Sequence, residues 1–198
     1  MRYLALGDSY TIGEGVTDEE RWPMQLVTRL RADGIAIDEP RIVATTGWTT
    51  DELSAAMDDA HLVPPYDLVS LLIGVNNQYR GRGVDQYQGE FQRLLERAIA
   101  LAGARHERVV VLSIPDWGVT DFGRQSGRDV GQVAHELDLY NAAACDLCAT
   151  REVAWVDITP LSRAWPQQVT ADGLHPSGEQ YGLWAAQAAP VVRAALNS

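Results

Sequence analysis

The sequence has 198 residues, of which 46% are hydrophobic, so it can bury a sizeable core and suggests one domain over residues 1–198. Its formal net charge of −11 argues against nucleic acid or an anionic membrane as a partner, because both need clustered Lys and Arg. The sequence has neither a signal peptide nor an apolar run near the roughly twenty residues of a membrane span, so we expect a soluble, cytoplasmic protein without membrane insertion.

Short apolar runs along the chain have the character of buried strands. The first, Tyr3 to Leu6, is apolar on both faces and stops at Gly7-Asp8-Ser9, as a buried parallel strand does when it ends in a functional loop. After it, residues 9–20 are rich in Gly and Thr and predict a loop. Four further runs predict strands: Arg41 to Ala44 within residues 35–45, Asp67 to Ile73, Val109 to Ile114, and Val153 to Val156.

The segments between the runs have apolar residues at helical spacing. They predict five helices. The first begins at Trp22-Pro23 and ends at Gly34, and the second follows a cap at Thr49 or Thr50. The other three span Asp85 to Ala102, Gln132 to Thr150, and Ser177 to Leu196. Gly118 to Gly131 predicts a glycine-rich loop. Strands that alternate with helices indicate an α/β fold, a three-layer α/β/α sandwich around a mostly parallel sheet of five strands.

The two cysteines, Cys145 and Cys148, form a C-x-x-C inside the predicted helix 132–150. Redox motifs of this kind place the first thiol at a helix amino terminus, so we interpret these residues as small core hydrophobes. Two thiols are also too few for a structural zinc site. No G-x-G-x-x-G or P-loop motif follows a predicted strand, which disfavours a nucleotide-binding or flavin-binding protein. We therefore predict no metal and no cofactor.

Four short motifs follow strands or precede helices, and all can meet at the carboxyl edge of the sheet, where α/β proteins bind ligands. They are Gly7-Asp8-Ser9, Thr46-Gly47, Gly74-Val75-Asn76 and Asp172 to Pro176. Each alone is also typical of a turn or a helix cap. Together, and in this order, they resemble the SGNH hydrolases, the GDSL-type esterases and lipases, over almost the whole chain. The resemblance implies a flavodoxin-like fold.

The resemblance also implies roles for these residues. Ser9 would be the nucleophile, His175 its general base and then general acid, and Asp172 the group that orients the imidazole, because a serine hydroxyl is a weak nucleophile without a base. The oxyanion hole would consist of the backbone N–H groups of Ser9 and Gly47 and the side-chain amide of Asn76.

The third motif departs from the family pattern, which usually reads G-x-N-D, because Asn77 replaces the carboxylate. We interpret position 77 as structural, since Asn can accept much the same hydrogen bonds as Asp. Asp8 is expected to anchor the loop beside Ser9 and not to act as a second base.

The expected activity is that of a serine esterase on a small-molecule acyl ester, with short acyl groups such as acetyl preferred. A lysophospholipase or acyl thioesterase with the same site stays an alternative, as does a catalytically silent binding module. Trp48, Trp117 and Trp165 lie near loops that should reach the carboxyl edge. They are candidates for substrate binding, with core or rim positions as the alternative. The sequence carries no indication of an oligomeric state.

Overall fold

The computed structural model describes residues 1–197. Five strands form one sheet in the order β2-β1-β3-β4-β5, and each neighbouring pair is parallel. The strands are β1 (Tyr3–Gly7), β2 (Arg41–Ala44), β3 (Leu68–Leu72), β4 (Val109–Leu112) and β5 (Ala154–Val156). The predicted parallel sheet of five strands is confirmed, and all five expected runs contain a strand.

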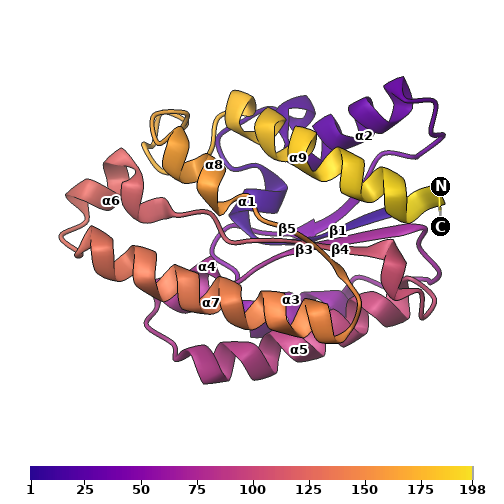
Figure 1. The fold of residues 1–198 in the computed structure, drawn as a ribbon, viewed down its shortest axis with the longest axis horizontal. Helices are drawn as coiled ribbons and strands as arrows, with labels where there is room; N and C mark the ends of the chain where they lie inside the picture. Colours follow the sequence, from indigo (N-terminus) through magenta and orange to yellow (C-terminus); the bar gives the residue numbers. More distant parts are fainter. Residues whose placement is uncertain (198) are drawn as a thin grey trace.

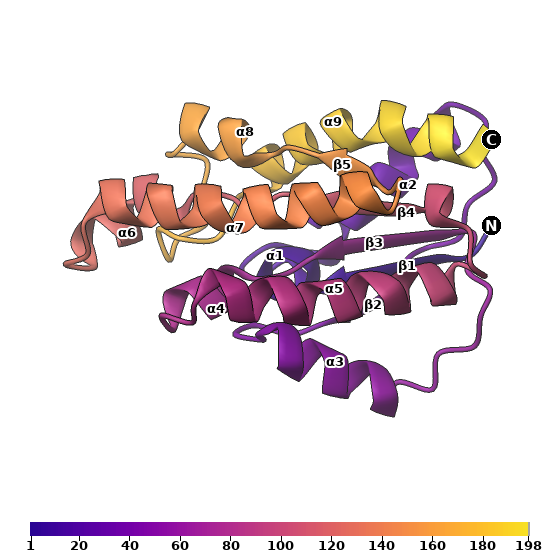
Figure 2. The ribbon, with the colours of Figure 1, turned by 60° about the horizontal axis from the view of Figure 1, so that its bottom comes forward.

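Helices cover both faces of the sheet and give the molecule its three layers (Figure 1). One face carries α2 (Trp22–Ala32) and α9 (Gly178–Asn197), which pack against each other, and α8 (Thr159–Ala164) beside α9. The other face carries α3 (Thr50–Asp59), α5 (Val84–Leu101) and α7 (Val130–Thr150). In Figure 2, turned so that this second face comes forward, α5 and α7 lie in front of the strands. The predicted α/β/α sandwich is therefore confirmed.

The burial of each strand follows from its place in the sheet. Every residue of β1, β3 and β4 is buried, because these are the three inner strands and helices cover both of their faces. The edge strands β2 and β5 each keep partly exposed residues. Within the apolar centre, the Tyr3 hydroxyl pairs with the Ser70 hydroxyl at 2.9 Å, so this polar pair joins β1 to β3.

Short helices replace two predicted loops. Residues 9–20 contain α1 (Ser9–Ile12) and a 3₁₀ turn at Asp18–Glu20, and residues 118–131 contain α6 (Asp121–Gln125). Two more helices were not predicted, α4 (Val75–Tyr79) and α8, and two further 3₁₀ turns lie at His106–Arg108 and Trp117–Val119. Helices of four to six residues are too short for an apolar period to appear in the sequence.

The two cysteines differ in their surroundings. Cys148 is fully buried in the core, as predicted, whereas Cys145 is only half-buried. Burial raises the pKa of both thiols, that of Cys148 to about 12, so neither is a reactive thiolate near neutral pH.

The first three strands end at the same level. In the register of the sheet, Gly7 of β1 lies beside Ala44 of β2 on one side and beside Leu72 of β3 on the other. Because the strands are parallel, the segments that follow them start side by side at one edge of the sheet. Three of the four sequence motifs are on these segments. No helix within residues 1–197 is long and apolar enough to cross a membrane.

Candidate active site

The nucleophile candidate Ser9 begins α1 directly after β1. The backbone there is tightly packed, because a Cβ on Gly7 would lie only 2.5 Å from the carbonyl oxygen of Leu72. Asp8 caps the helix, since its Oδ1 accepts a hydrogen bond from the N–H of Tyr10 at 3.0 Å. Ser9 is 4% exposed. These contacts hold the serine at the carboxyl edge of the sheet and agree with the anchoring role expected for Asp8.

Burial also changes the acidity of Asp8. The carboxyl group is fully buried, which raises its pKa to about 7 although the hydrogen bond from Tyr10 opposes the shift. One oxygen, Oδ2, has no hydrogen-bond partner within residues 1–197. Burial therefore favours the uncharged form of the Asp8 carboxyl.

His175 and Asp172 form a direct pair. The distance between His175 Nδ1 and Asp172 Oδ2 is 2.6 Å, and Gly173 between them has a φ of 70°, a left-handed conformation that glycine adopts without strain. The other carboxylate oxygen accepts hydrogen bonds from the N–H groups of Leu174 and His175 and from the Thr170 hydroxyl. Burial raises the pKa of Asp172, but these four hydrogen bonds outweigh it and lower the pKa to about 2.

This pairing determines what the imidazole can do. The Asp172 carboxylate can only accept a hydrogen bond, so in the neutral imidazole of His175 the proton is on Nδ1. Nε2 is then left with its lone pair, as a general base requires.

The oxyanion-hole candidates come from the segments after β2 and β3. Gly47 has a φ of 87°, a conformation that side chains disfavour, and its carbonyl oxygen accepts a 2.7 Å hydrogen bond from Arg80. The Asn76 side-chain N–H₂ donates to the Trp48 carbonyl at 2.9 Å. Because an amide nitrogen carries two hydrogens, this bond fixes the side chain and leaves one N–H for a ligand.

Asn77 ties the two segments together. It is fully buried on α4, and its Oδ1 accepts from the Thr50 N–H at 3.0 Å, at the start of α3. Its Nδ2 donates to the Thr50 hydroxyl at 2.6 Å and to Glu90 Oε2 at 3.2 Å. The segment with Gly47 is thereby held next to the segment with Asn76, which agrees with a structural role at position 77.

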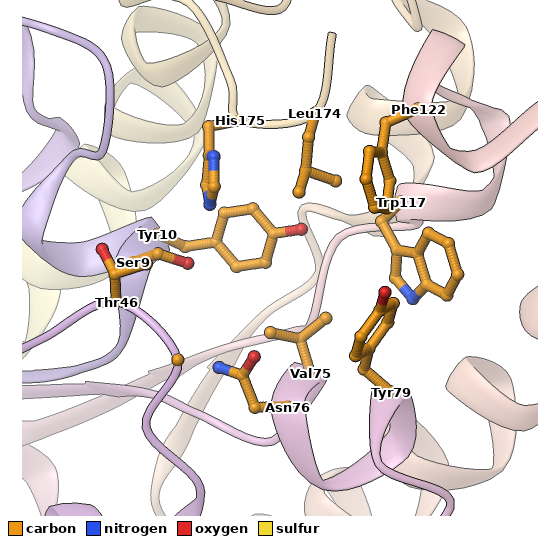
Figure 3. A pocket seen from close by; sticks show the side chains of 11 residues that line it. Ser9, Tyr10, Thr46, Val75, Asn76, Tyr79, Trp117, Phe122, Leu174 and His175 are labelled. Atoms are coloured by element: carbon orange, nitrogen blue, oxygen red, sulfur yellow. The ribbon is translucent and has the colours of Figure 1, made fainter. Parts of the chain in front are cut away.

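The predicted residues meet at one pocket of about 210 Å³ (Figure 3). Its lining includes Ser9, Gly47, Asn76 and His175, which come from all four sequence motifs. In Figure 3 the His175 ring points into the pocket toward Ser9. No hydrogen bond joins the Ser9 hydroxyl to the imidazole within residues 1–197, so a side-chain movement has to precede proton transfer.

The rest of the lining is mostly apolar and uncharged. It consists of Tyr10, Thr46, Val75, Tyr79, Trp117, Phe122 and Leu174. Of the three tryptophans predicted to bind substrate, Trp117 lines the pocket, and its indole N–H donates to Gln78. Trp48 packs against the core instead, and Trp165 is 45% exposed at the end of α8. The structure gives no support to a binding role for these two.

Sequence reasoning missed most of the pocket wall. Thr46, Val75 and Leu174 lie within three of the motifs, where no role was predicted for them, and Tyr10 directly follows Ser9. Their place in or next to a motif was the signal that could have found them. Tyr79 and Phe122 had no such signal, because they reach the pocket from the unpredicted helices α4 and α6. Within residues 1–197 no group of three or more His, Cys, Asp or Glu side chains is arranged to hold a metal ion.

Residues 5–183 match the GDSL-like lipase/acylhydrolase family. The chain belongs to this family. It is therefore a hydrolase that acts on ester bonds. No curated protein matches the chain.

Solved structures share the fold of this GDSL-family chain at low sequence identity. The structure of TesA is 17% identical, with a TM-score of 0.76, and the match covers 98% of this chain and 99% of TesA. The psychrotrophic esterase EstA from Pseudoalteromonas sp. is 17% identical, with a TM-score of 0.74 and coverages of 100% and 99%. A carbohydrate acetylesterase family member from Sinorhizobium meliloti is 19% identical, with a TM-score of 0.71, and both chains are covered completely.

Proposed function

We propose that the protein is a serine esterase that cleaves short acyl esters, acetyl esters above all. The observation that carries the proposal is the 2.6 Å pair of Asp172 and His175 at the same pocket as Ser9. A hydroxyl, a base and a carboxylate that orients the base are the three groups that acyl transfer through serine requires.

In the first half-reaction, the Ser9 oxygen attacks the acyl carbonyl carbon while His175 Nε2 takes the hydroxyl proton. The carbonyl π electrons move to the oxygen, and the resulting oxyanion accepts hydrogen bonds from the N–H groups of Ser9 and Gly47 and from the Asn76 amide. When the intermediate collapses, the bond to the alcohol oxygen breaks and the alcohol leaves with the proton from His175.

In the second half-reaction, water attacks the acyl group on Ser9 and gives a proton to His175. The tetrahedral intermediate forms again, the acyl carbon separates from the serine oxygen, and Ser9 recovers its proton from the imidazole. The products are one carboxylic acid and one alcohol. Asp172, with its pKa near 2, stays ionised and stabilises the imidazolium in both halves.

The size of the pocket supports a short acyl group. Its volume of about 210 Å³ is below the roughly 300–1,000 Å³ of pockets that enclose drug-sized ligands. The carbohydrate acetylesterase family member from Sinorhizobium meliloti has the same fold, which also favours acetyl esters. A lysophospholipase needs room for a long acyl chain, so the volume disfavours that alternative.

A series of p-nitrophenyl esters from acetate to octanoate tests the proposal. We expect kcat/KM to be highest for acetate or butyrate and Ser9→Ala to abolish hydrolysis of every ester. A rate that climbs with chain length beyond butyrate would overturn the short-acyl assignment. Hydrolysis that survives in Ser9→Ala would remove Ser9 as the nucleophile.

A further inference from the structure

The proposed oxyanion donor Gly47 lies in a tight turn after β2. The Trp48 N–H donates to the Thr45 carbonyl at 3.3 Å. Gly47 has a φ of 87°, whereas the φ of Thr46 is not positive. A four-residue turn in which only the third residue has a positive φ is a type II turn. The peptide bond between Thr46 and Gly47 is therefore the central one of the turn, and it carries the N–H that the proposed function uses.

The type of turn decides in which direction this N–H points. Type I and type II turns have a similar outline, but their central peptides differ by a rotation of roughly 150–170°. Glycine can adopt the backbone conformations of both types, because it has no Cβ. A change to type I would therefore turn the Gly47 N–H around, away from the oxyanion, while the chain on either side stays in place. The donor needs contacts that keep the turn in its type II form.

Two side chains from one helix hold this turn. Asn76 in α4 donates to the Trp48 carbonyl at 2.9 Å. Arg80, which directly follows α4, donates to the Gly47 carbonyl at 2.7 Å. The two donors are about one helical turn apart, and they hold successive carbonyl groups of the chain. In Figure 3 the Asn76 amide nitrogen points to the segment that follows Thr46.

Arg80 also connects the turn to the helix that follows it. A Cβ on Gly47 would have a single neighbour within 4 Å in residues 1–197, apart from the two adjacent residues, and this neighbour is Arg80 Nη2 at 4.0 Å. The guanidinium is fixed in turn by Glu52 of α3, with Nη1 3.3 Å from Oε2. That oxygen accepts a 2.8 Å hydrogen bond from the Thr49 N–H at the start of α3. Charge-assisted bonds of this kind are stronger than those between neutral groups.

We propose that Arg80 is a positioning residue of the active site, which keeps the Gly47 N–H directed at the oxyanion by holding the next carbonyl group. The inference rests on the proposed esterase function. Arg80 is not among the residues of 1–197 that line the pocket, so it acts through the turn and not on the substrate. Without the guanidinium, the turn also populates the form in which the N–H points elsewhere. The step that forms the oxyanion then slows, whereas binding of the uncleaved ester stays the same.

Arg80→Met tests the inference, because methionine keeps the apolar stem of the side chain and removes the donors. The Arg80 side chain is 44% exposed, so the substitution should not unfold the chain. For p-nitrophenyl acetate we expect kcat to fall about tenfold, less than on loss of a whole oxyanion donor, and KM to change by less than about twofold. Both half-reactions pass through an oxyanion, so the fall appears whichever of them limits the rate.

Two further measurements separate positioning from other roles. Trifluoroacetone, with which a serine forms an oxyanion adduct, should bind Arg80→Met about tenfold more weakly. Arg80→Lys keeps a charged donor and should recover kcat to within about threefold of the unmodified enzyme. The loss of kcat in Arg80→Met should persist in about 1 M NaCl, where the screening length of about 3 Å suppresses a direct effect of the arginine charge on the oxyanion.

Arg97→Met is the matched control. Arg97 donates to the Ser54 carbonyl at 2.8 Å and pairs with Asp58 at 2.6 Å. It therefore has the same kinds of partner as Arg80, but it joins α5 to α3 and not to the turn. Its replacement should leave kcat and the affinity for trifluoroacetone within about twofold of the unmodified enzyme.

An unchanged kcat in Arg80→Met would overturn the inference. A fall that appears mainly in KM, that Arg80→Lys does not recover, that Arg97→Met shows equally, or that disappears in salt would also overturn it. Failure of the esterase proposal has a different result: the unmodified enzyme does not cleave the ester, or cleaves it equally fast after Ser9→Ala. If hydrolysis depends on Ser9 but not on Arg80, only the inference about Arg80 fails.

Discussion

Replacement of Asn77 by Asp, the residue usual in the family, should destabilise this particular chain. The Asn77 amide donates to Glu90 Oε2 at 3.2 Å in a fully buried position. Asn77→Asp removes that donor and puts a second carboxylate against Glu90. The hydrogen bond that Asn77 accepts from the Thr50 N–H can still form, whereas the one that its amide donates to the Thr50 hydroxyl at 2.6 Å is lost together with the contact to Glu90.

The magnitude follows from the distance. At 3.2 Å and an effective dielectric constant of about 20, two unit charges repel by about 5 kcal/mol. Arg82, 3.5 Å from Glu90, offsets part of this repulsion, and the Glu90 side chain is 14% exposed to water. Uptake of one proton by the carboxylate pair also limits the cost. We therefore expect Asn77→Asp to lower the free energy of unfolding by about 2–4 kcal/mol at pH 8.

Urea unfolding of the unmodified protein, Asn77→Asp, Glu90→Gln and the double variant measures this effect. The loss in Asn77→Asp should shrink at pH 5, because the folded pair binds a shared proton that the unfolded chain releases more readily. The double variant should recover most of the stability at pH 8, since the glutamine amide can donate to the new carboxylate. The reasoning is refuted if Asn77→Asp is as stable as the unmodified protein at pH 8. It is also refuted if the double variant is no more stable than Asn77→Asp alone at that pH.

Four further predictions concern the site. Asn76→Ala should lower kcat by about 10²–10³-fold, because one oxyanion donor is lost, and a loss below about threefold in steady-state assays would remove Asn76 from the mechanism. Because the pKa of Asp172 is about 2, protonation of this carboxylate should cause no loss of kcat between about pH 6 and 8, and a loss there that Asp172→Asn abolishes would contradict an ionised Asp172. Asp172→Asn should lower kcat by about 10³–10⁴-fold at every pH in that range, and kcat within tenfold of the unmodified enzyme would contradict its orienting role. Burial raises the pKa of Asp8 to about 7, so stability should fall by up to about 4 kcal/mol as pH rises from about 4 to 7, and urea unfolding of Asp8→Asn should show no such fall if this carboxyl is the cause.

The sequence was informative where a segment's chemistry depends on residue type alone. Apolar runs such as Tyr3 to Leu6 revealed the inner strands, because burial on both faces leaves no polar positions. The motif residues could be found because nucleophile, base and amide donor need particular side chains. Their meeting at one pocket could be expected from parallel strands, which all end at the same edge.

The pocket wall was not predictable in the same way. Tyr79 and Phe122 reach the pocket from α4 and α6, helices too short to show a period. The residue type also does not determine in which direction a side chain next to a motif points. Trp117 lines the pocket, but Trp48 packs on the core and Trp165 is exposed to solvent. Aromatic residues near a motif therefore indicate a binding wall only once the local backbone is known.

The central claim is that a serine near the start of the chain and a histidine near its end act together as nucleophile and base. Covalent labelling with a fluorophosphonate, followed by mass spectrometry of the intact protein and its peptides, tests this most directly. We predict a single adduct on Ser9 and a rate of labelling at least about a thousandfold lower in His175→Ala. An adduct on another residue, or equal rates of labelling with and without the imidazole, would contradict the account.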